Sequence, residues 1–343
     1  MNSGENTVIK LLEFQEQGMF RDFIKEYWKK DHIFAKHPFF FDWQHKGSLT
    51  YNCMSAFQKG ELVGVFCFIP LCHYDSQLST KQIFMALFRA LSDGGIGIGY
   101  RLYKSVLEEY EPEFIAGTTF SSTMIPYWKG QGFAVQTMDH YVALSPFLNN
   151  FKIAKVPKDL IIQFQEVGPE ISFHKVSKKD LDKINSDGLY SHQWPLKSDT
   201  YIKNCYMNHP VYKYDVYAIS KNNELLALCV IRPILIDNTV VLRFVDFVGS
   251  NEVFSVLNEF VMNIIKIYNA EYIDIYSLGI PSLLLQKAGF IKRKKLKGVI
   301  IPNYFEPIVN KNMDVICGYK TTQPQIPVRL FKADADLDRP SKI

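Results

Sequence analysis

The stretch Leu-Ser-Asp-Gly-Gly-Ile-Gly-Ile-Gly-Tyr-Arg-Leu, residues 91–102, decides how this chain folds. It follows an apolar run at 82–91 that predicts a buried strand, and a helical pattern of apolar residues begins at Ile98 and stops before Pro112. Such a turn directs consecutive N–H groups into one concavity at the positive end of a helix. Four glycines in six residues favour a phosphate or pyrophosphate site, and a plain tight turn is the alternative.

The second half of the chain repeats this order of elements. In the first half, strands are predicted at 62–69 and 113–120, on either side of the glycine-rich stretch. In the second half, the pattern predicts a strand, a helix and a strand at 240–248, 253–268 and 272–276. Short phrases also recur in order: His37-Pro38 as His209-Pro210, Gly60-Glu61-Leu62-Val63 as Asn223-Glu224-Leu225-Leu226, and Gly132-Phe133 as Gly289-Phe290. The sequence therefore predicts two tandem α/β domains of one fold, each with a mixed (α+β) sheet.

Length and periodicity set the expected domain boundaries. The 343 residues exceed one ordinary domain and suggest about two of roughly 150–200 residues. The segment 146–170 lacks periodicity and contains three prolines. We therefore expect a first domain at 1–150, a linker at 151–170, and a second domain with a C-terminal tail at 171–343.

Composition excludes several classes of protein. With 47% hydrophobic and 22% charged residues the chain is not disordered throughout, and no uncharged apolar run reaches the roughly 18 residues that a membrane span needs. A net charge of +4 does not indicate nucleic acid, and the amino terminus has no secretory pattern. Six cysteines without a Cys-x-x-Cys pair and scattered histidines favour free thiols and no metal, so we expect a cytoplasmic location.

Aromatic residues make up 14% of the chain, with 19 Tyr, 26 Phe and 4 Trp. A core uses part of this set, and the many tyrosines leave enough for the walls of a ligand pocket. No Gly-x-Ser-x-Gly motif or Ser-His-Asp context indicates a covalent intermediate, so direct group transfer is the expected chemistry.

The glycine turn resembles the acyl-CoA pyrophosphate loop of the GCN5-related N-acetyltransferase superfamily, whose pattern is Gln/Arg-x-x-Gly-x-Gly/Ala. Gly97 and Gly99 match the small positions, and Gly94 stands in place of Gln/Arg. The resemblance implies tandem domains of this fold and an acyl-CoA donor, either acetyl-CoA or a short hydroxyacyl-CoA. The donor would be held by the backbone of Gly94, Gly95, Gly97, Ile98 and Gly99.

Two candidate catalytic residues flank this loop. The segment 125–133 resembles the superfamily's Tyr-x-x-x-Gly-Phe segment, which implies Tyr127 as general acid, although Tyr127 stands one residue early and Trp128 takes its place. Asp93 at the mouth of the loop is either a general base for the amine or a helix-capping carboxylate. The second copy has one glycine, Gly249, where the first has its cradle, so we expect the second domain to hold the acceptor or complete the cleft.

Nearly the whole chain resembles the tandem N-acyltransferases of bacterial glycan biosynthesis, in particular those of the anthrose pathway. The matching phrases are Pro195–Ser198, His209–Tyr212, Ile301–Pro307 and the tail Phe331–Pro340. The resemblance implies a nucleotide-linked amino sugar as acceptor, such as a dTDP-4-amino-4,6-dideoxyhexose used for O-antigen or another surface glycan. The implied acceptor-binding residues are Lys197, Ser198, His209, Tyr212, Asn303, Tyr304, Glu306, Asp334, Asp336, Asp338 and Arg339.

Alternatives remain at the level of the sequence. The charged tail is either part of the site or a solvated terminus, and the basic run 292–297 is a solvated loop, a diphosphate-steering patch or an RNA contact. The rival functions are an aminoacyl-tRNA-dependent peptidoglycan transferase and a noncatalytic ligand-binding protein. The leading interpretation has only small-molecule partners, with no nucleic acid and no membrane, and leaves monomer and dimer open.

Overall fold

The computed structural model describes residues 7–79, 81–92, 97–160, 171–184, 189, 193–336 and 338–340. The chain divides into two compact units. The first unit comprises Met1–Val135, Cys317–Pro324 and Ala335–Ile343, and the second comprises Gln136–Ile316 and Gln325–Asp334. These bounds differ from the expected linker at 151–170, because both units take in chain from the other half.

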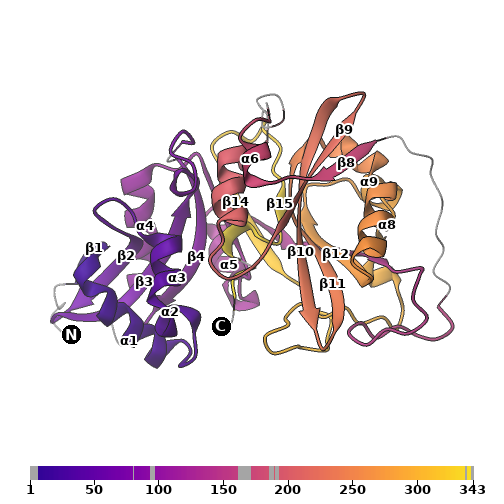
Figure 1. The fold of residues 1–343 in the computed structure, drawn as a ribbon. Coiled ribbons are helices and arrows are strands. Elements are labelled where there is room, and N and C mark those ends of the chain that lie inside the picture. Colours follow the sequence, from indigo (N-terminus) through magenta and orange to yellow (C-terminus); the bar gives the residue numbers. More distant parts are fainter. Residues whose placement is uncertain are drawn as a thin grey trace. The chain divides into compact units, whose positions relative to one another are not determined.

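The first unit is built on a seven-stranded mixed sheet (Figure 1). In spatial order its strands are β1 (Val8–Glu13), β2 (Thr50–Gln58), β3 (Glu61–Pro70), β4 (Gln82–Ala90), β5 (Phe114–Thr118), β14 (Ile316–Thr321) and β6 (Ala134–Thr137). The pair β4–β5 is parallel, while β1–β2, β2–β3, β3–β4 and β5–β14 are antiparallel.

The second unit has an eight-stranded mixed sheet of the same plan. In spatial order its strands are β8 (Ser172–Lys175), β9 (Asp215–Lys221), β10 (Glu224–Ile236), β11 (Thr239–Gly249), β12 (Ala270–Leu278), β7 (Asp139–Leu144) and β13 (Ile291–Lys292), and β15 (Leu330–Phe331) also pairs with β12. Here β11–β12 is the parallel pair. The pair β11–β12 therefore corresponds to β4–β5, and the prediction of mixed α/β sheets in both halves is confirmed.

Each sheet takes a strand from the opposite half of the chain. β14, near the C-terminus, pairs with β5, and β7, from the first half, pairs with β12 over Tyr272↔Leu144 to Ser277↔Asp139. The strand that follows the parallel pair is thus exchanged between the two halves. This exchange explains why no single cut in the sequence separates the units.

Helices cover both faces of the first sheet. They are α1 (Gln17–Tyr27), α2 (Ile33–Lys36), α3 (Pro38–His45), α4 (Ile98–Tyr110) and α5 (Ile125–Gly130). Met54 of β2 packs in one cluster with α4, whereas Tyr51, three residues earlier, contacts Phe41 of α3 with ring centroids 4.7 Å apart. Since side chains alternate along a strand, α4 and α3 lie on opposite faces.

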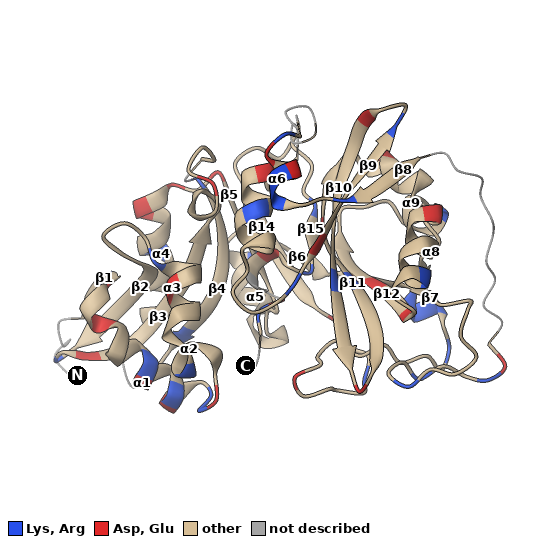
Figure 2. Ribbon diagram, viewed as in Figure 1, with Lys and Arg blue, Asp and Glu red and all other residues tan. Residues whose placement is uncertain are grey.

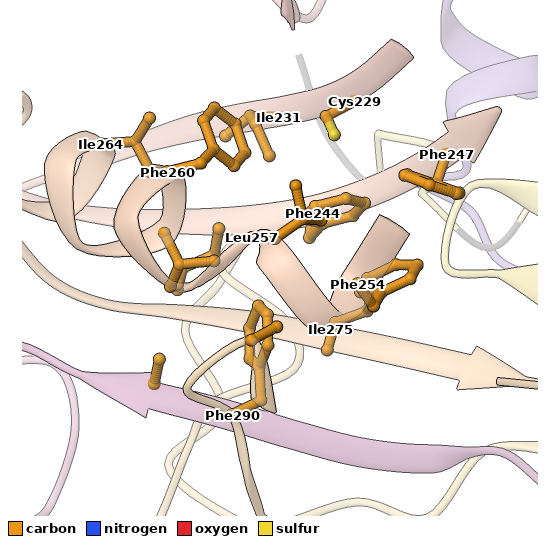
Figure 3. Close-up of a cluster of buried hydrophobic side chains, with 14 of the residues drawn as sticks. Cys229, Ile231, Phe244, Phe247, Phe254, Leu257, Phe260, Ile264, Ile275 and Phe290 are labelled. Carbon is orange, nitrogen blue, oxygen red and sulfur yellow. The ribbon is translucent and has the colours of Figure 1, made fainter. Parts of the chain in front are cut away.

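The core of the second unit lies between its sheet and α8 (Asn258–Ile267), as Figure 3 shows. Its other α-helices are α6 (Lys178–Leu181), α7 (Asp199–Ile202) and α9 (Ser282–Lys287). The apolar side chains of α8 recur at helical spacing and are buried against the strands: Phe260, Val261, Ile264 and Ile265. Burial of each such side chain contributes roughly 1.5–3 kcal/mol relative to exposure.

Most predicted elements are present within a residue or two of their expected bounds. The helix expected at 253–268 differs, because its first part is the 3-10 helix η5 (Asn251–Val256) and α8 begins only at Asn258. The hydroxyl of Ser250 accepts a hydrogen bond from the N–H of Glu252, which fixes this tighter turn. In the part of the chain that the structure describes, no helix is long and apolar enough to cross a membrane.

Candidate functional site

The parallel strands β4 and β5 separate before β4 ends. Their register runs from Gln82↔Phe114 to Met85↔Gly117 and stops there, while β4 continues to Ala90. β5 ends at Thr118, and Thr119 has a φ of +59°, a left-handed conformation that is unusual for a β-branched residue. The chain thus turns away from β4 and leaves a gap in the sheet.

A β-bulge in β4 lies at this gap. Cys67 of β3 pairs with Leu87 and Phe68 pairs with Met85, so the register passes over Ala86. Among the described residues, Ala86 therefore has a register partner on neither β3 nor β5. Bulges expose backbone groups and are frequent beside active sites.

A cavity of about 240 Å³ occupies the gap. Its lining comes from β4, the turn after β5, α5 and the C-terminal tail: Trp28, Phe66, Met85, Ala86, Leu87, Phe88, Thr118, Thr119, Phe120, Ser121, Met124, Trp128 and Arg339. Rings and thioethers dominate, and Arg339 is the one ionised side chain in this lining. Such a cavity suits an apolar or weakly polar group with one anionic or oxygen-rich end.

Two glycines make room for the Phe120 ring in this lining. A Cβ at Gly117 would lie 2.6 Å from Phe120 Cε1 and 2.7 Å from Met85 Cε, and a Cβ at Gly318 would lie 2.6 Å from Phe120 Cε2. The ring therefore rests directly on the backbone of β5 and β14. Phe120 also stacks on Trp128, with centroids 5.2 Å apart and an interplanar angle of 21°.

The N-terminus of α4 begins beside the same gap. Gly97 precedes the helix with a φ of +85°, which glycine adopts without strain. The first helical bond runs from Arg101 N–H to the Gly97 carbonyl, so the amides of Ile98 and Gly99 come before it and have no intrahelical acceptor. Gly99 lies against Phe88: a Cβ there would be 3.0 Å from Phe88 Cζ. The anion-binding turn predicted from the sequence is thus adjacent to the cavity, while Asp93, Gly94 and Gly95 lie outside the described residues.

Trp128, and not Tyr127, lines the cavity. The Tyr127 hydroxyl is buried and has no hydrogen-bond partner among the described residues, and burial, with a smaller effect of Tyr100, raises the pKa of that hydroxyl. A raised pKa keeps the phenol protonated, as a general acid requires. Its role as acid stays a prediction, since an indole occupies the nearer position.

The second unit fills its corresponding gap with its own chain. The β11–β12 register ends at Phe244↔Ile275, and β15 then pairs with β12 through Ser277↔Phe331 and Leu278↔Leu330. The bulge residue there is Val245, since Val230 pairs with Asp246 and Ile231 with Phe244. The Val245 carbonyl accepts a hydrogen bond from Ala333 N–H at 3.2 Å. The corresponding gap in the first unit contains the cavity described above.

Lys197 and Asp334 form part of this filling. The Lys197 ammonium lies 2.6 Å from Asp246 and 2.7 Å from Asp334, and all three side chains are buried. Burial alone would lower the pKa of Lys197, but the two carboxylates raise it above its ordinary value. Burial raises the pKa of Asp334 to about 6 against the pull of Lys197, since this carboxyl shares one ammonium with Asp246. These contacts give Lys197 and Asp334 a structural role in the second unit.

The other expected acceptor residues of the second unit lie in internal networks. Ser198 caps α7 by accepting from Tyr201 N–H, and His209 Nδ1 accepts from the N–H of Tyr212. The Tyr212 hydroxyl donates to Glu306 at 2.8 Å, and its ring lies 3.1 Å from the Arg232 guanidinium carbon.

Asn303 and Tyr304 both contact Lys332. The buried amide oxygen of Asn303 accepts from the Lys332 ammonium at 2.8 Å, and the same ammonium lies 5.6 Å from the Tyr304 ring centroid. Figure 2 shows charged residues within strands β11 and β12 of this unit as well. Many polar side chains of the second unit therefore bind one another within that unit.

The structure divides the C-terminal tail between the units. Asp334 belongs to the second unit, and Asp338 and Arg339 belong to the first. Thr118 Oγ1 donates to the Ala335 carbonyl at 3.3 Å, Asp338 is buried, and the Arg339 guanidinium lies 4.8 Å from the Phe34 ring centroid. Asp336 lies in the short 3-10 helix η7 (Asp334–Asp336). The binding of an acceptor by these four residues stays a prediction.

Two further expectations concern charge and metals. Within the basic run, Arg293 and Lys294 both bind Asp314, at 2.9 and 3.1 Å, and Lys292 binds Asp139 at 2.6 Å. These cations are therefore partly neutralised by the second unit itself. Across the described residues, no group of three His, Cys, Asp or Glu side chains has a metal-binding arrangement.

No family model matches this sequence, and no curated protein matches it. Solved structures do match the fold. A GCN5-related N-acetyltransferase from Anabaena variabilis ATCC 29413 is 10% identical with a TM-score of 0.55, over 92% of this chain and 73% of that one. A probable N-acyltransferase from Enterococcus faecalis V583 is 9% identical with a TM-score of 0.53, over 91% and 72%.

A third match is a GCN5-related glucosamine N-acetyltransferase region of a fungal multi-domain β-N-acetylglucosaminidase. It is 9% identical with a TM-score of 0.51, over 93% of this chain and 38% of that one. At such low identity these likenesses show the fold alone. The expected fold, that of the GCN5-related N-acetyltransferases, is confirmed over most of the chain.

Proposed function

We propose that this chain is an acyl-CoA-dependent N-acyltransferase whose donor site lies in the first unit. The observation that carries the proposal is the open gap between β4 and β5, with a bulge at Ala86 and the amides of Ile98 and Gly99 beside it. A thioester needs an oxyanion donor, and a pyrophosphate needs clustered amides at a helix start. The bulge and the amides at the start of α4 are adjacent in this unit. In the second unit the tail fills the corresponding gap.

The donor's parts are assigned by the chemistry of each wall. The pyrophosphate binds the amides of Gly97–Gly99 and, as the sequence predicts, those of Gly94 and Gly95. The pantetheine arm follows β4 past Phe88, and the thioester carbonyl accepts from a backbone N–H at the bulge. The acyl group enters the cavity between Met85 and Trp128.

The reaction is direct attack by a neutral amine on the thioester carbon. A C–N bond forms, the C–S bond breaks, and the amine proton leaves as the thiolate is protonated. A preorganised N–H aimed at the developing oxyanion contributes roughly 3 kcal/mol. Holding amine and thioester together in one cavity supplies much of the remaining acceleration. Asp93 as base and Tyr127 as acid are part of this proposal.

We further propose a nucleotide-linked amino sugar, such as a dTDP-4-amino-4,6-dideoxyhexose, as acceptor in surface-glycan biosynthesis. The support is the sequence resemblance carried by Pro195–Ser198, His209–Tyr212 and Ile301–Pro307. One solved structure of this fold is a glucosamine N-acetyltransferase region, so the fold is compatible with an amino-sugar acceptor. An acetyl or a short hydroxyacyl group, carried by coenzyme A, is compatible with a cavity of about 240 Å³.

We expect acetyl-CoA to bind the wild-type chain and Gly99→Val to weaken this binding at least about tenfold (1.4 kcal/mol). The added side chain meets Phe88 Cζ at about 3 Å and covers the amides of the first turn of α4. Isothermal titration calorimetry measures both affinities.

Gly18→Val is the matched control. Gly18 is the second residue of α1, as Gly99 is of α4, and nothing lies within 4 Å of a Cβ placed there. Both variants carry the same intrinsic cost of valine in a helix, so they differ in the contact with Phe88 and in the covering of the α4 amides. If wild-type protein gives no heat of binding with millimolar acetyl-CoA, and acetyl-CoA competes with no other ligand, the donor site is rejected.

A further inference from the structure

The cavity of the first unit is lined by residues from both faces of the sheet. Phe66 and Phe88 form a directly opposed pair, and Phe66 packs in the α4 cluster with Trp128. Leu87 pairs with Cys67, so it points to the opposite face, where α1, α2 and α3 lie. Since Phe88 and Leu87 both line the cavity, it lies at the gap between the two faces.

Two lining residues belong to the α1–α3 face. Trp28 directly follows α1 and is 46% exposed, which is high for a tryptophan. Arg339 lies with its guanidinium over Phe34 of α2, whose ring contacts Phe41 of α3 at 5.2 Å. The start of α4, where the donor is proposed to bind, lies on the other face. The α1–α3 face therefore offers a separate approach to the same cavity.

Two histidines of this face, His32 and His45, lie within the electrostatic influence of Arg339. The nearby imidazoles are buried: burial, with a smaller effect of Arg339, lowers the pKa of His32 to about 2 and that of His45 to about 3. Both are therefore neutral at pH 7, and the potential there is set by fixed charges. The charge of Lys29 also acts on His32, so it adds to the positive field near Trp28.

We propose that Trp28 and Arg339 form an acceptor-side subsite that binds a nucleoside diphosphate, with the nucleobase on Trp28 and a phosphate on Arg339. An exposed indole is a stacking surface for a base, because every nucleobase has an aromatic face. A guanidinium binds phosphate oxygens in a bidentate manner. The subsite rests on the proposed function, since it places the acceptor opposite the acyl donor.

This location differs from the one expected from the sequence, where the second domain holds the acceptor. The expected residues of that unit, such as Lys197 and Asn303, are engaged by their own neighbours, whereas Trp28 presents nearly half of its surface to solvent. Of the expected tail residues, Arg339 is the one that lines the cavity. The sugar amine of an acceptor bound here would reach the thioester through the gap.

The test uses protein saturated with coenzyme A, so that the donor site is occupied, and titrates dTDP and inorganic pyrophosphate by calorimetry. We expect Trp28→Ala to weaken dTDP at least tenfold and to leave pyrophosphate unchanged. We expect Arg339→Met to weaken both ligands at least tenfold. Tyr27→Ala and Lys25→Met, an exposed aromatic and an exposed cation of α1 that do not line the cavity, are the controls and should match wild type.

Three results would overturn the subsite: no dTDP binding to the CoA-saturated protein, binding equal in wild type and both variants, or displacement of coenzyme A by dTDP. Each leaves the donor site standing, because coenzyme A binding is measured first in the same samples. Failure of coenzyme A itself to bind would instead reject the proposed function.

Discussion

Replacing Ala86 by Phe is expected to lower the affinity for acetyl-CoA at least about 100-fold, or roughly 2.7 kcal/mol. Ala86 is the bulge residue of β4 and lines a cavity of only about 240 Å³. A benzyl group there occupies the space assigned to the acyl group and shields the backbone N–H groups of the bulge. Calorimetry with acetyl-CoA measures the loss, and release of free thiol reports turnover once an acceptor is available.

The control for this substitution is Ala134→Phe. Ala134 lies in β6 of the same sheet, its side chain is exposed, and it does not line the cavity. An exposed aromatic in a strand is compatible with that structure, so acetyl-CoA should bind as in wild type. Equal affinities in the Ala86 variant and wild type, with both folded by circular dichroism, would show that the donor binds elsewhere.

The parts of this site that depend on local sequence could be predicted. Four closely spaced glycines between an apolar run and a helical pattern predict a turn and a helix start, and α4 begins at Ile98 as expected. The gap itself could not be predicted, because it depends on where the β4–β5 register stops and how Thr119 turns. The sequence there is a run of apolar residues that predicts one continuous strand. It indicates neither the end of the β4–β5 register nor the turn at Thr119.

The bulge and the exchanged strand are also hidden in the sequence. Ala86 is one small residue among larger ones. It is recognised as a bulge only from the pairing with β3, in which Cys67 faces Leu87 and Phe68 faces Met85. β14 is a six-residue strand with no charge pattern that names its partner. Pairing between distant strands depends on the whole sheet. The sequence therefore suggests a linker at 151–170, whereas the fold divides the chain elsewhere.

The role of the expected acceptor residues cannot be decided from the sequence, because a charged side chain in a matching phrase looks the same whether it binds a ligand or another side chain. Lys197 and Asp334 form one ion pair inside the second unit, and Asn303 accepts from Lys332. Trp28, which lines the cavity, stands in no recognised phrase. Its exposure is the signal, and exposure is not visible in a sequence.

Replacing Asp274 by Asn is expected to cost roughly 3–5 kcal/mol in the free energy of unfolding at pH 7, by removing one partner of a buried ion pair. Both Asp274 oxygens accept from the Arg243 guanidinium, at 2.9 and 2.8 Å, and His140 Nε2 lies 3.0 Å from Oδ2. Burial alone would raise the pKa of this carboxyl, but Arg243 and His140 hold it below its ordinary value. Its contribution is therefore present above the unfolded-state pKa, near 4, and is lost as the pH falls toward the folded-state value.

Urea unfolding of the variant at pH 7 and under acid conditions measures both effects. Asp314→Asn is the matched control: this carboxyl binds Arg293 and Lys294 but is 51% exposed, so its loss should cost less than about 1 kcal/mol. Replacing Arg243 together with Asp274 by Met and Leu should recover part of the stability, because no charge is then left buried without a partner. A cost for Asp274→Asn as small as that of the control would show that the buried pair does not stabilise the second unit.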